Sequence, residues 1–152
     1  MEKNMVVLEI QGKKREYPYG TQYWEIVREY QKEQKDPILL VMEENRLREL
    51  HRRAKKDCRL EFITMRDPAG YNAYRRSLCL MMLKAIHQVL GNGEKYQVGI
   101  HFVVSDGLYC TLQSERILDQ EFLDQVKEVM RELCEAAIPI EKRTMDTNDA
   151  VE

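Results

Sequence analysis

The sequence predicts an α+β protein of two small lobes. Near the start of the chain, apolar side chains recur at every second position, which is typical of half-buried β-strands. Later segments space their apolar side chains three and four residues apart, which is typical of helices packed on a core. A break around residues 66–70, with a proline inside it, separates the two halves. We therefore expect one domain over residues 1–66 and a second over residues 67–152.

The first lobe is expected to open with a β-hairpin. Residues 6–10 place alternate apolar side chains on one face, and residues 14–17 return as a second strand. The Gln11-Gly12 dipeptide between them supplies the turn.

A helix and two further strands complete this lobe. Thr21 is the predicted N-cap of the helix, and Asp36-Pro37 ends it because the residue before a proline disfavours helical backbone. The apolar run 38–42 and the alternation over residues 60–64 predict strands. The resulting order is that of a β-grasp lobe, in which one helix packs across one face of a small mixed sheet.

The second lobe is predicted to be a helix, a hairpin and another helix. Apolar side chains at helical spacing place the first helix over residues 71–90, and a glycine pair follows it as C-cap and turn. Strands over residues 98–104 and 108–112 flank Asp106-Gly107, a dipeptide typical of hairpin turns.

The last predicted helix begins after Asp119, a favourable N-cap residue, and ends before Pro139. Residues 140–143 would add a final strand. Residues 146–150 resemble the capped start of a further helix, so we expect the second domain to be truncated at its C-terminal end. The expected apolar face of the last helix comprises Phe122, Leu123, Val126, Val129, Met130, Leu133 and Ala137.

The bulk composition argues against several classes of protein. Hydrophobic residues make up 43% and charged residues 33% of the 152 residues, an ordinary balance for a globular chain. The net charge of −2 gives no overall attraction to nucleic acid or anionic membranes, so such binding requires a local patch. No apolar run approaches the roughly 20 residues that span a bilayer, and no signal peptide begins the chain. We expect a cytoplasmic location and no membrane partner.

Neither a metal site nor a phosphate loop is expected. His51, His87 and His101 are dispersed, whereas a metal needs three or four converging ligands. The four cysteines form no C-x-x-C pair, so we expect reduced thiols. Residues 91–95, GNGEK, lack the spacing of a Walker A loop and predict a plain turn. We therefore expect no metal, no cofactor and no complete catalytic site in this chain.

The strongest candidate for a binding surface is the basic segment 46–59. It holds seven basic residues against Glu49 and Asp57, and such a cluster can neutralise RNA phosphates. The alternative is a solvated charge run on a loop, which is favoured by the lack of interleaved aromatic side chains to stack on bases. Both interpretations stay open. The candidate RNA- or anion-binding residues are Arg46, Arg48, Arg52, Arg53, Lys55, Lys56, Arg75 and Arg76.

Taken in order, these segments resemble the N-terminal half of the threonyl-tRNA synthetase family. Residues 5–65 resemble its TGS domain, with the turn, helix start and strands in the same sequence. Residues 70–150 resemble the start of its editing domain. There the family's RHS-x-x-HLL-x-x-A helix, DG-x-Y hairpin and PIERR segment are similar to residues 75–85, 106–109 and 139–143.

The chain departs from the editing motif at the two histidines. Histidines at i and i+4 on one helix face can jointly grip a metal or a substrate hydroxyl. Arg76 and Leu80 stand at these positions, so the resemblance implies no editing chemistry. Two alternatives stay open for the cleft beside them. Arg76 would offer a fixed cation to a carboxylate or phosphate, with Leu80 as an apolar pocket floor, or side-chain packing would fill the cleft.

A second family also resembles the chain, the uridine-kinase-like nucleoside kinases of bacteria. Its members join the same two domains, with the histidines replaced, to a P-loop kinase, and residues 74–78 (YRRSL) are closer to that form. The first hypothesis is therefore a non-catalytic regulatory or RNA-binding N-terminal region of an ATP-dependent nucleoside kinase, whose downstream kinase domain would be its partner. The alternative is the N-terminal region of a threonyl-tRNA synthetase or a related tRNA-editing deacylase. The expected ligands are tRNA-like RNA or a small anion.

Overall fold

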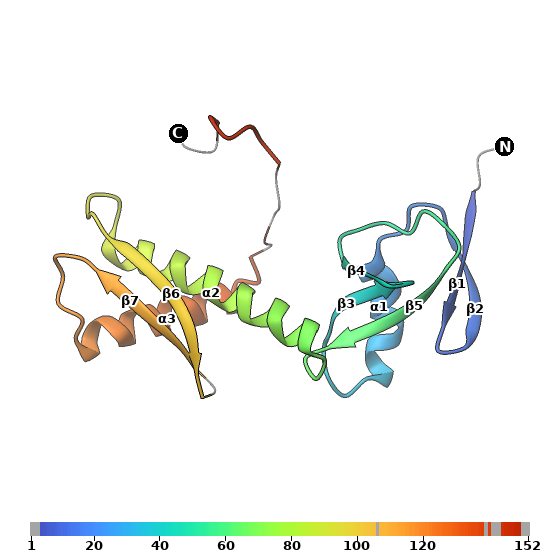
Figure 1. Cartoon of the computed structure of the whole chain (residues 1–152), viewed down its shortest axis with the longest axis horizontal. Coiled ribbons are helices and arrows are strands. Elements are labelled where there is room, and N and C mark those ends of the chain that lie inside the picture. Colours follow the sequence, from blue (N-terminus) through green and yellow to red (C-terminus); the bar gives the residue numbers. More distant parts are fainter. Residues whose placement is uncertain (1–3, 106, 139, 141–143, 150–152) are drawn as a thin grey trace. The chain divides into compact units, whose positions relative to one another are not determined.

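The computed structural model describes residues 4–105, 107–138, 140 and 144–149, and its fold is α+β, as the sequence predicts (Figure 1). The chain divides into two compact units, unit 1 over Met1–Leu78 and unit 2 over Cys79–Glu152. The division falls within the long helix α2, Pro68–Leu90. A functional boundary at residue 66 stays a prediction.

Unit 1 is built on a five-stranded sheet with the order β2-β1-β5-β3-β4. Strands β1 (Met5–Ile10) and β2 (Lys13–Pro18) form the expected antiparallel hairpin. Strand β5 (Cys58–Thr64) runs parallel to β1 and antiparallel to β3 (Ile38–Glu43). Strand β4 (Arg46–Glu49) pairs antiparallel with β3 at the sheet edge. The sequence pattern does not predict β4, because its side chains are almost all charged.

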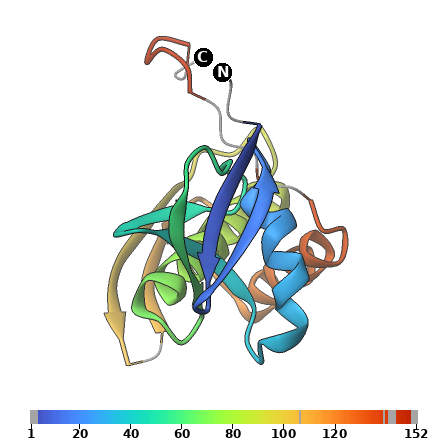
Figure 2. The same ribbon diagram turned by 90° about the vertical axis from the view of Figure 1, so that its right-hand side faces the viewer.

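Helix α1 (Tyr23–Tyr30) lies across one face of this sheet, as Figure 2 shows with the β1–β2 hairpin toward the viewer. A short 3₁₀ turn, η1 (Gln31–Glu33), follows it. Helix and sheet share one core, since the apolar face of α1 is buried against the inward side chains of the strands. This core contains Val6, Leu8, Ile10, Tyr23, Ile26, Val27, Tyr30, Ile38, Val41 and Leu60. The arrangement is the one predicted, a helix packed across a small mixed sheet.

The start of α1 differs from the prediction that Thr21 is its N-cap. The N-cap residue is Gln22, which makes no side-chain capping bond, and the Thr21 hydroxyl donates to the carbonyl of Pro18 at 2.8 Å. A side-chain cap is not needed because the backbone amides of Tyr23 and Trp24 already donate to carbonyls of a later segment. The Thr21 prediction is therefore wrong.

Unit 2 contains the second half of α2, the antiparallel strands β6 (Gln97–Val104) and β7 (Gly107–Gln113), and helix α3 (Gln120–Glu135). The two helices and the hairpin enclose one core, whose buried members are Ala85, Ile86, Leu90, Phe122 and Val126.

Two predicted caps in unit 2 are confirmed. The Asp119 carboxylate accepts a hydrogen bond from the Phe122 amide at 2.8 Å, as an N-cap should. Gly91 adopts a φ of +82° after α2, and its amide donates to the carbonyl of His87.

Some expected features lie outside the described residues. They are the turn residue Asp106, Pro139, and residues 141–143 of the expected last strand. Residues 147–149 form a turn rather than the start of a helix. No helix in the described part of the chain is long and apolar enough to cross a membrane.

Candidate anion-binding pocket

The basic segment is docked against the start of α1 by backbone hydrogen bonds. The carbonyls of Leu50 and Arg52 accept from the amides of Trp24 and Tyr23, each at 2.9 Å. Ala54 is fully buried; its amide and carbonyl bind Thr21 and Gly20, at 2.9 and 2.8 Å. The segment is therefore a fixed part of unit 1, and its basic side chains project from an ordered backbone.

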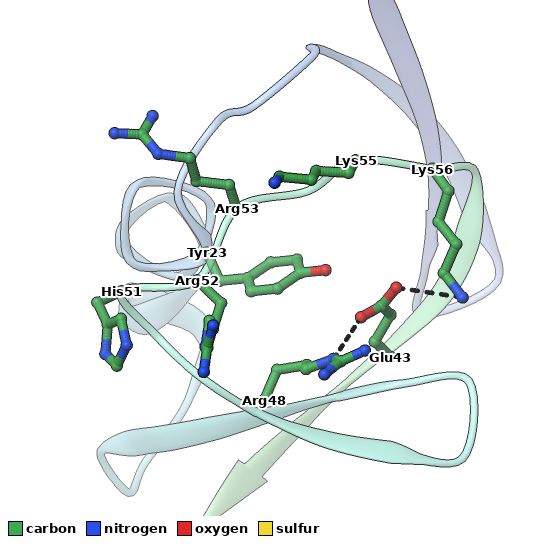
Figure 3. A pocket seen from close by; sticks show the side chains of 8 residues that line it. All are labelled: Tyr23, Glu43, Arg48, His51, Arg52, Arg53, Lys55 and Lys56. Carbon is green, nitrogen blue, oxygen red and sulfur yellow. Dashed lines mark hydrogen bonds and ion pairs between the residues drawn. The ribbon is translucent and has the colours of Figure 1, made fainter. Parts of the chain in front are cut away.

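These side chains surround a cavity of about 540 Å³ in unit 1 (Figure 3). Among the described residues, the lining contributes five lysine and arginine side chains, one histidine, one tyrosine and a single carboxylate. The lining residues are Tyr23, Glu43, Arg48, His51, Arg52, Arg53, Lys55 and Lys56. Such an excess of positive charge in one concave site favours anions.

Glu43, at the end of β3, is the buried carboxylate of the pocket, with 7% of its surface exposed. Arg48 Nε lies 2.6 Å from one carboxylate oxygen, and Lys56 Nζ lies 3.2 Å from the other. Burial alone would raise the pKa of Glu43, but the hydrogen bonds from Arg48 and Lys56 outweigh it and hold the pKa below its usual value. Glu43 is therefore ionised at neutral pH and neutralises part of the charge of these two cations.

The remaining cations are held differently. Arg52 Nε lies 3.7 Å from Glu49, an exposed contact that is shared with His51. Arg53 donates from Nη1 to the carbonyl of Gly20 at 2.9 Å, a neutral partner that leaves its charge uncompensated. Within the described chain, Lys55 has no carboxylate partner. Figure 3 shows its ammonium group turned to the side of Tyr23 and Arg53, whereas that of Lys56 is turned to Glu43.

The structure brings five of the eight candidate binding residues into the pocket and leaves three outside it. Arg46 is exposed on β4 and does not line the cavity. On α2, the Arg75 guanidinium lies 5.8 Å from the centre of the Tyr71 ring, and Arg76 is exposed. Leu80 leaves 50% of its surface to solvent, and its place at a pocket floor stays a prediction.

Sequence reasoning missed three lining residues. Tyr23 is predicted only as a core residue of α1; its ring is buried, and burial first and Glu43 second raise the pKa of its phenol. Glu43 follows an apolar run, and nothing in the pattern indicates that two cations will reach it. Of these three residues, only His51 lies inside the basic segment, so its position in the sequence is a signal that could have identified it. In the part of the chain that the structure describes, no three His, Cys, Asp or Glu side chains are grouped as a metal requires.

The chain is similar in sequence to threonine–tRNA ligases. Over 142 residues, 93% of this chain, it is 30% identical to the threonine–tRNA ligase of Thermotoga neapolitana, of which it covers 22%. It is 32% identical to the threonine–tRNA ligase of Methylococcus capsulatus over 71% of the chain and 16% of that protein. The corresponding protein of Coxiella burnetii is also 32% identical, over 63% of the chain and 14% of its own length.

These relatives are much longer than the matched region, so the chain spans about a fifth or less of their length. No model of a protein family matches the chain. A solved structure of ATBAG1 in complex with HSP70 aligns with a TM-score of 0.36 at 11% identity over 58% of this chain and 55% of that one, too low to support an argument. The nucleoside-kinase parent finds no support among these relatives, and the alternative hypothesis fits them better. The similarity supports a threonyl-tRNA-synthetase-type domain in this chain.

Proposed function

We propose that this chain is a non-catalytic RNA-binding region of a threonyl-tRNA-synthetase-type protein, with residues 1–66 as a TGS-like domain and residues 67–152 as a degenerate editing-like domain. The observation that carries the proposal is the gathering of five cationic side chains around one cavity by a segment anchored to α1. The relatives, which are named as tRNA ligases, make tRNA the RNA to test first.

The composition of the pocket favours contact with the RNA backbone. Lysine and arginine neutralise phosphates and release counterions, which supplies affinity without sequence preference. Of the two ring side chains in the described lining, Tyr23 is buried in the core, and His51 lies 3.4 Å from the exposed Glu49. The proposed contact is therefore electrostatic and independent of base identity.

The proposed lack of catalytic activity rests on two residues of helix α2. Arg76 and Leu80 stand where the editing family has paired histidines, and neither side chain can share a metal or act as a base at neutral pH. Purified protein is expected to hydrolyse no mischarged tRNA, and turnover of seryl-tRNA would contradict this part of the proposal.

The kinase parent is kept as a second candidate because of the Arg-Arg-Ser form of residues 75–77. The two candidates differ in what the rest of the protein would contain. A Walker A motif elsewhere in the gene would favour the kinase, and synthetase motifs would favour the first proposal.

The test is a titration of labelled tRNA with the chain at several salt concentrations. The logarithm of the binding constant should fall linearly with the logarithm of salt concentration. The Arg52→Ala/Arg53→Ala variant should bind more weakly and with a slope shallower by about one for each lost phosphate contact. Arg46→Ala removes a cation of the same segment outside the pocket, and should have a smaller effect. Undetectable binding at low salt, or equal effects of all these variants, would contradict the proposal.

A further inference from the structure

The cations of the pocket fall into two sets with different surroundings. The inner set, Arg48 and Lys56, is bound to both oxygens of the buried Glu43. The outer set, Arg53 and Lys55, has no carboxylate partner among the described residues, and Arg52 shares the exposed Glu49 with His51. The charge available to a ligand therefore lies at Arg53 and Lys55.

Arg53 is prepared to bind an anion. Its hydrogen bond to the Gly20 carbonyl at 2.9 Å fixes one guanidinium nitrogen, and the other N–H groups of the fork stay available. A guanidinium presents a planar fork to a tetrahedral oxyanion, whereas an ammonium acts as a point charge. Since residues 53 and 55 flank the buried Ala54, one backbone anchor positions both cations.

Two cations without a carboxylate partner among the described residues line the same cavity, and together they match two negative charges. A phosphodiester inside an RNA chain carries one charge, whereas a phosphate monoester carries about 1.5 to 2 near pH 7. The Tyr23 ring is buried, and Figure 3 shows the His51 ring on the side of Arg52, away from Lys55. The recognised group at Arg53 and Lys55 is therefore the phosphate itself.

We infer that Lys55 and Arg53 form a site for a phosphate monoester, and that the pocket binds this dianion without regard to the attached base. This inference rests on the proposed role of the pocket as an anion site. The monoester has two sources, a free 5′-nucleotide and the 5′-phosphate end of an RNA, and both present the same group to the pocket.

The chain carries its own probe for this site. Trp24, its single tryptophan, follows Tyr23 in α1, is 38% exposed, and donates its amide to the carbonyl of Leu50 in the docked segment. Binding at Arg53 and Lys55 should change its fluorescence. Calorimetry with the same ligands keeps the test valid if the fluorescence does not respond.

The first arm of the experiment titrates AMP, UMP, inorganic phosphate and adenosine into the whole chain. AMP and UMP should bind with equal affinity within about twofold, and adenosine should not bind. The second arm compares one short RNA with a 5′-phosphate or a 5′-hydroxyl. A free nucleotide site requires binding in the first arm, and an RNA-end site requires tighter binding of the 5′-phosphorylated RNA.

Matched variants distinguish binding at this site from general electrostatic attraction to the positive surface. Lys55→Ala and Arg53→Ala should each weaken monoester binding about tenfold or more, the usual effect of losing a hydrogen bond to a charged group. Arg46→Ala, with the same loss of charge outside the pocket, should change it less than about twofold. Equal effects of the three variants would overturn the inference. It would also be overturned if neither method detected monoester binding and the RNA showed no preference for the 5′-phosphate.

The two proposals fail separately. Salt-dependent tRNA binding without monoester binding or 5′-phosphate preference would leave the proposed function standing and remove the inference. Nucleotide binding without tRNA binding would support the phosphate site and remove the proposed RNA-binding function.

Discussion

Glu43→Gln is expected to lower the stability of unit 1 and to raise the affinity of the pocket for anions. The carboxylate is buried and makes charge-assisted contacts to Arg48 at 2.6 Å and to Lys56 at 3.2 Å. Such a bond contributes about 1.5–3 kcal/mol, and glutamine keeps one oxygen as an acceptor. We therefore expect a loss of about 2 kcal/mol in the free energy of unfolding, or roughly 10 °C in melting temperature for a domain of this size.

The pH dependence follows from the direction of the pKa shift. The pKa of Glu43 is lower in the folded chain than in the unfolded one, because Arg48 and Lys56 favour the ionised form. Its contribution to stability is therefore fully present above the unfolded pKa, about 4.3, and is lost as the pH falls through the lower folded value. The stability difference between the wild type and Glu43→Gln should be constant near neutral pH and shrink below about pH 4.

The assay is urea unfolding of both proteins between pH 3 and 8, together with anion titration at pH 7. Glu16→Gln, on the exposed surface of β2, removes the same charge and should change stability by less than about 0.5 kcal/mol. Affinity for phosphate should rise in Glu43→Gln, since the only carboxylate among the described lining residues is gone. Unchanged stability, or weaker anion binding with a normal fold, would refute the electrostatic account of the pocket.

Three further predictions concern a close backbone contact, a helix cap and a buried thiol. A Cβ on Gly70 would lie 1.9 Å from the Thr64 carbonyl oxygen, so Gly70→Ala should cost about 1–3 kcal/mol in urea unfolding, whereas Gly93→Ala, with nothing within 4 Å, should cost little. Asp119→Ala should destabilise unit 2 by about 1 kcal/mol and reduce helical circular dichroism, while Asp119→Asn should retain most of the cap; equal losses would contradict the capping role. Burial raises the pKa of Cys58 to about 11, so at pH 8 a thiol reagent should modify the exposed Cys134 well before Cys58, and simultaneous modification would indicate that β5 is not packed as described.

Local patterns predict most of the secondary structure. The period-two pattern of residues 6–10 predicts β1, and the cap preference of Asp119 predicts the start of α3, since both depend on neighbours in sequence. The sequence does not predict strand β4, because its residues show no alternation of apolar side chains. They are Arg46, Leu47, Arg48 and Glu49. It forms because the edge of β3 is available for pairing. The availability of another strand's edge cannot be predicted from the residues of β4 themselves.

The pocket is predictable only in part, for a related reason. The basic segment contains six of the eight described lining residues, five of them predicted as binding residues. Glu43 and Tyr23 come from β3 and α1, and only long-range packing brings them to the cavity. The pairing of Tyr23 and Trp24 amides with residues 50–52 is likewise non-local. The residue type alone predicts Thr21 as the N-cap. It does not cap α1, because the carbonyls of another segment accept the hydrogen bonds of the first amides of the helix.

The anchoring of the segment bears on the choice between a solvated charge run and a binding site. A solvated run would let its cations separate, since like charges repel and long side chains gain entropy from freedom. In unit 1 the backbone bonds at Leu50, Arg52 and Ala54 keep five cations around one cavity. The carboxylates of Glu43 and Glu49 contact three of these cations. The folded chain therefore bears a repulsion that a bound anion would relieve, and the relief is greatest where no carboxylate is present, at Arg53 and Lys55. This argument favours a site for a phosphate group over a surface that only keeps the chain hydrated.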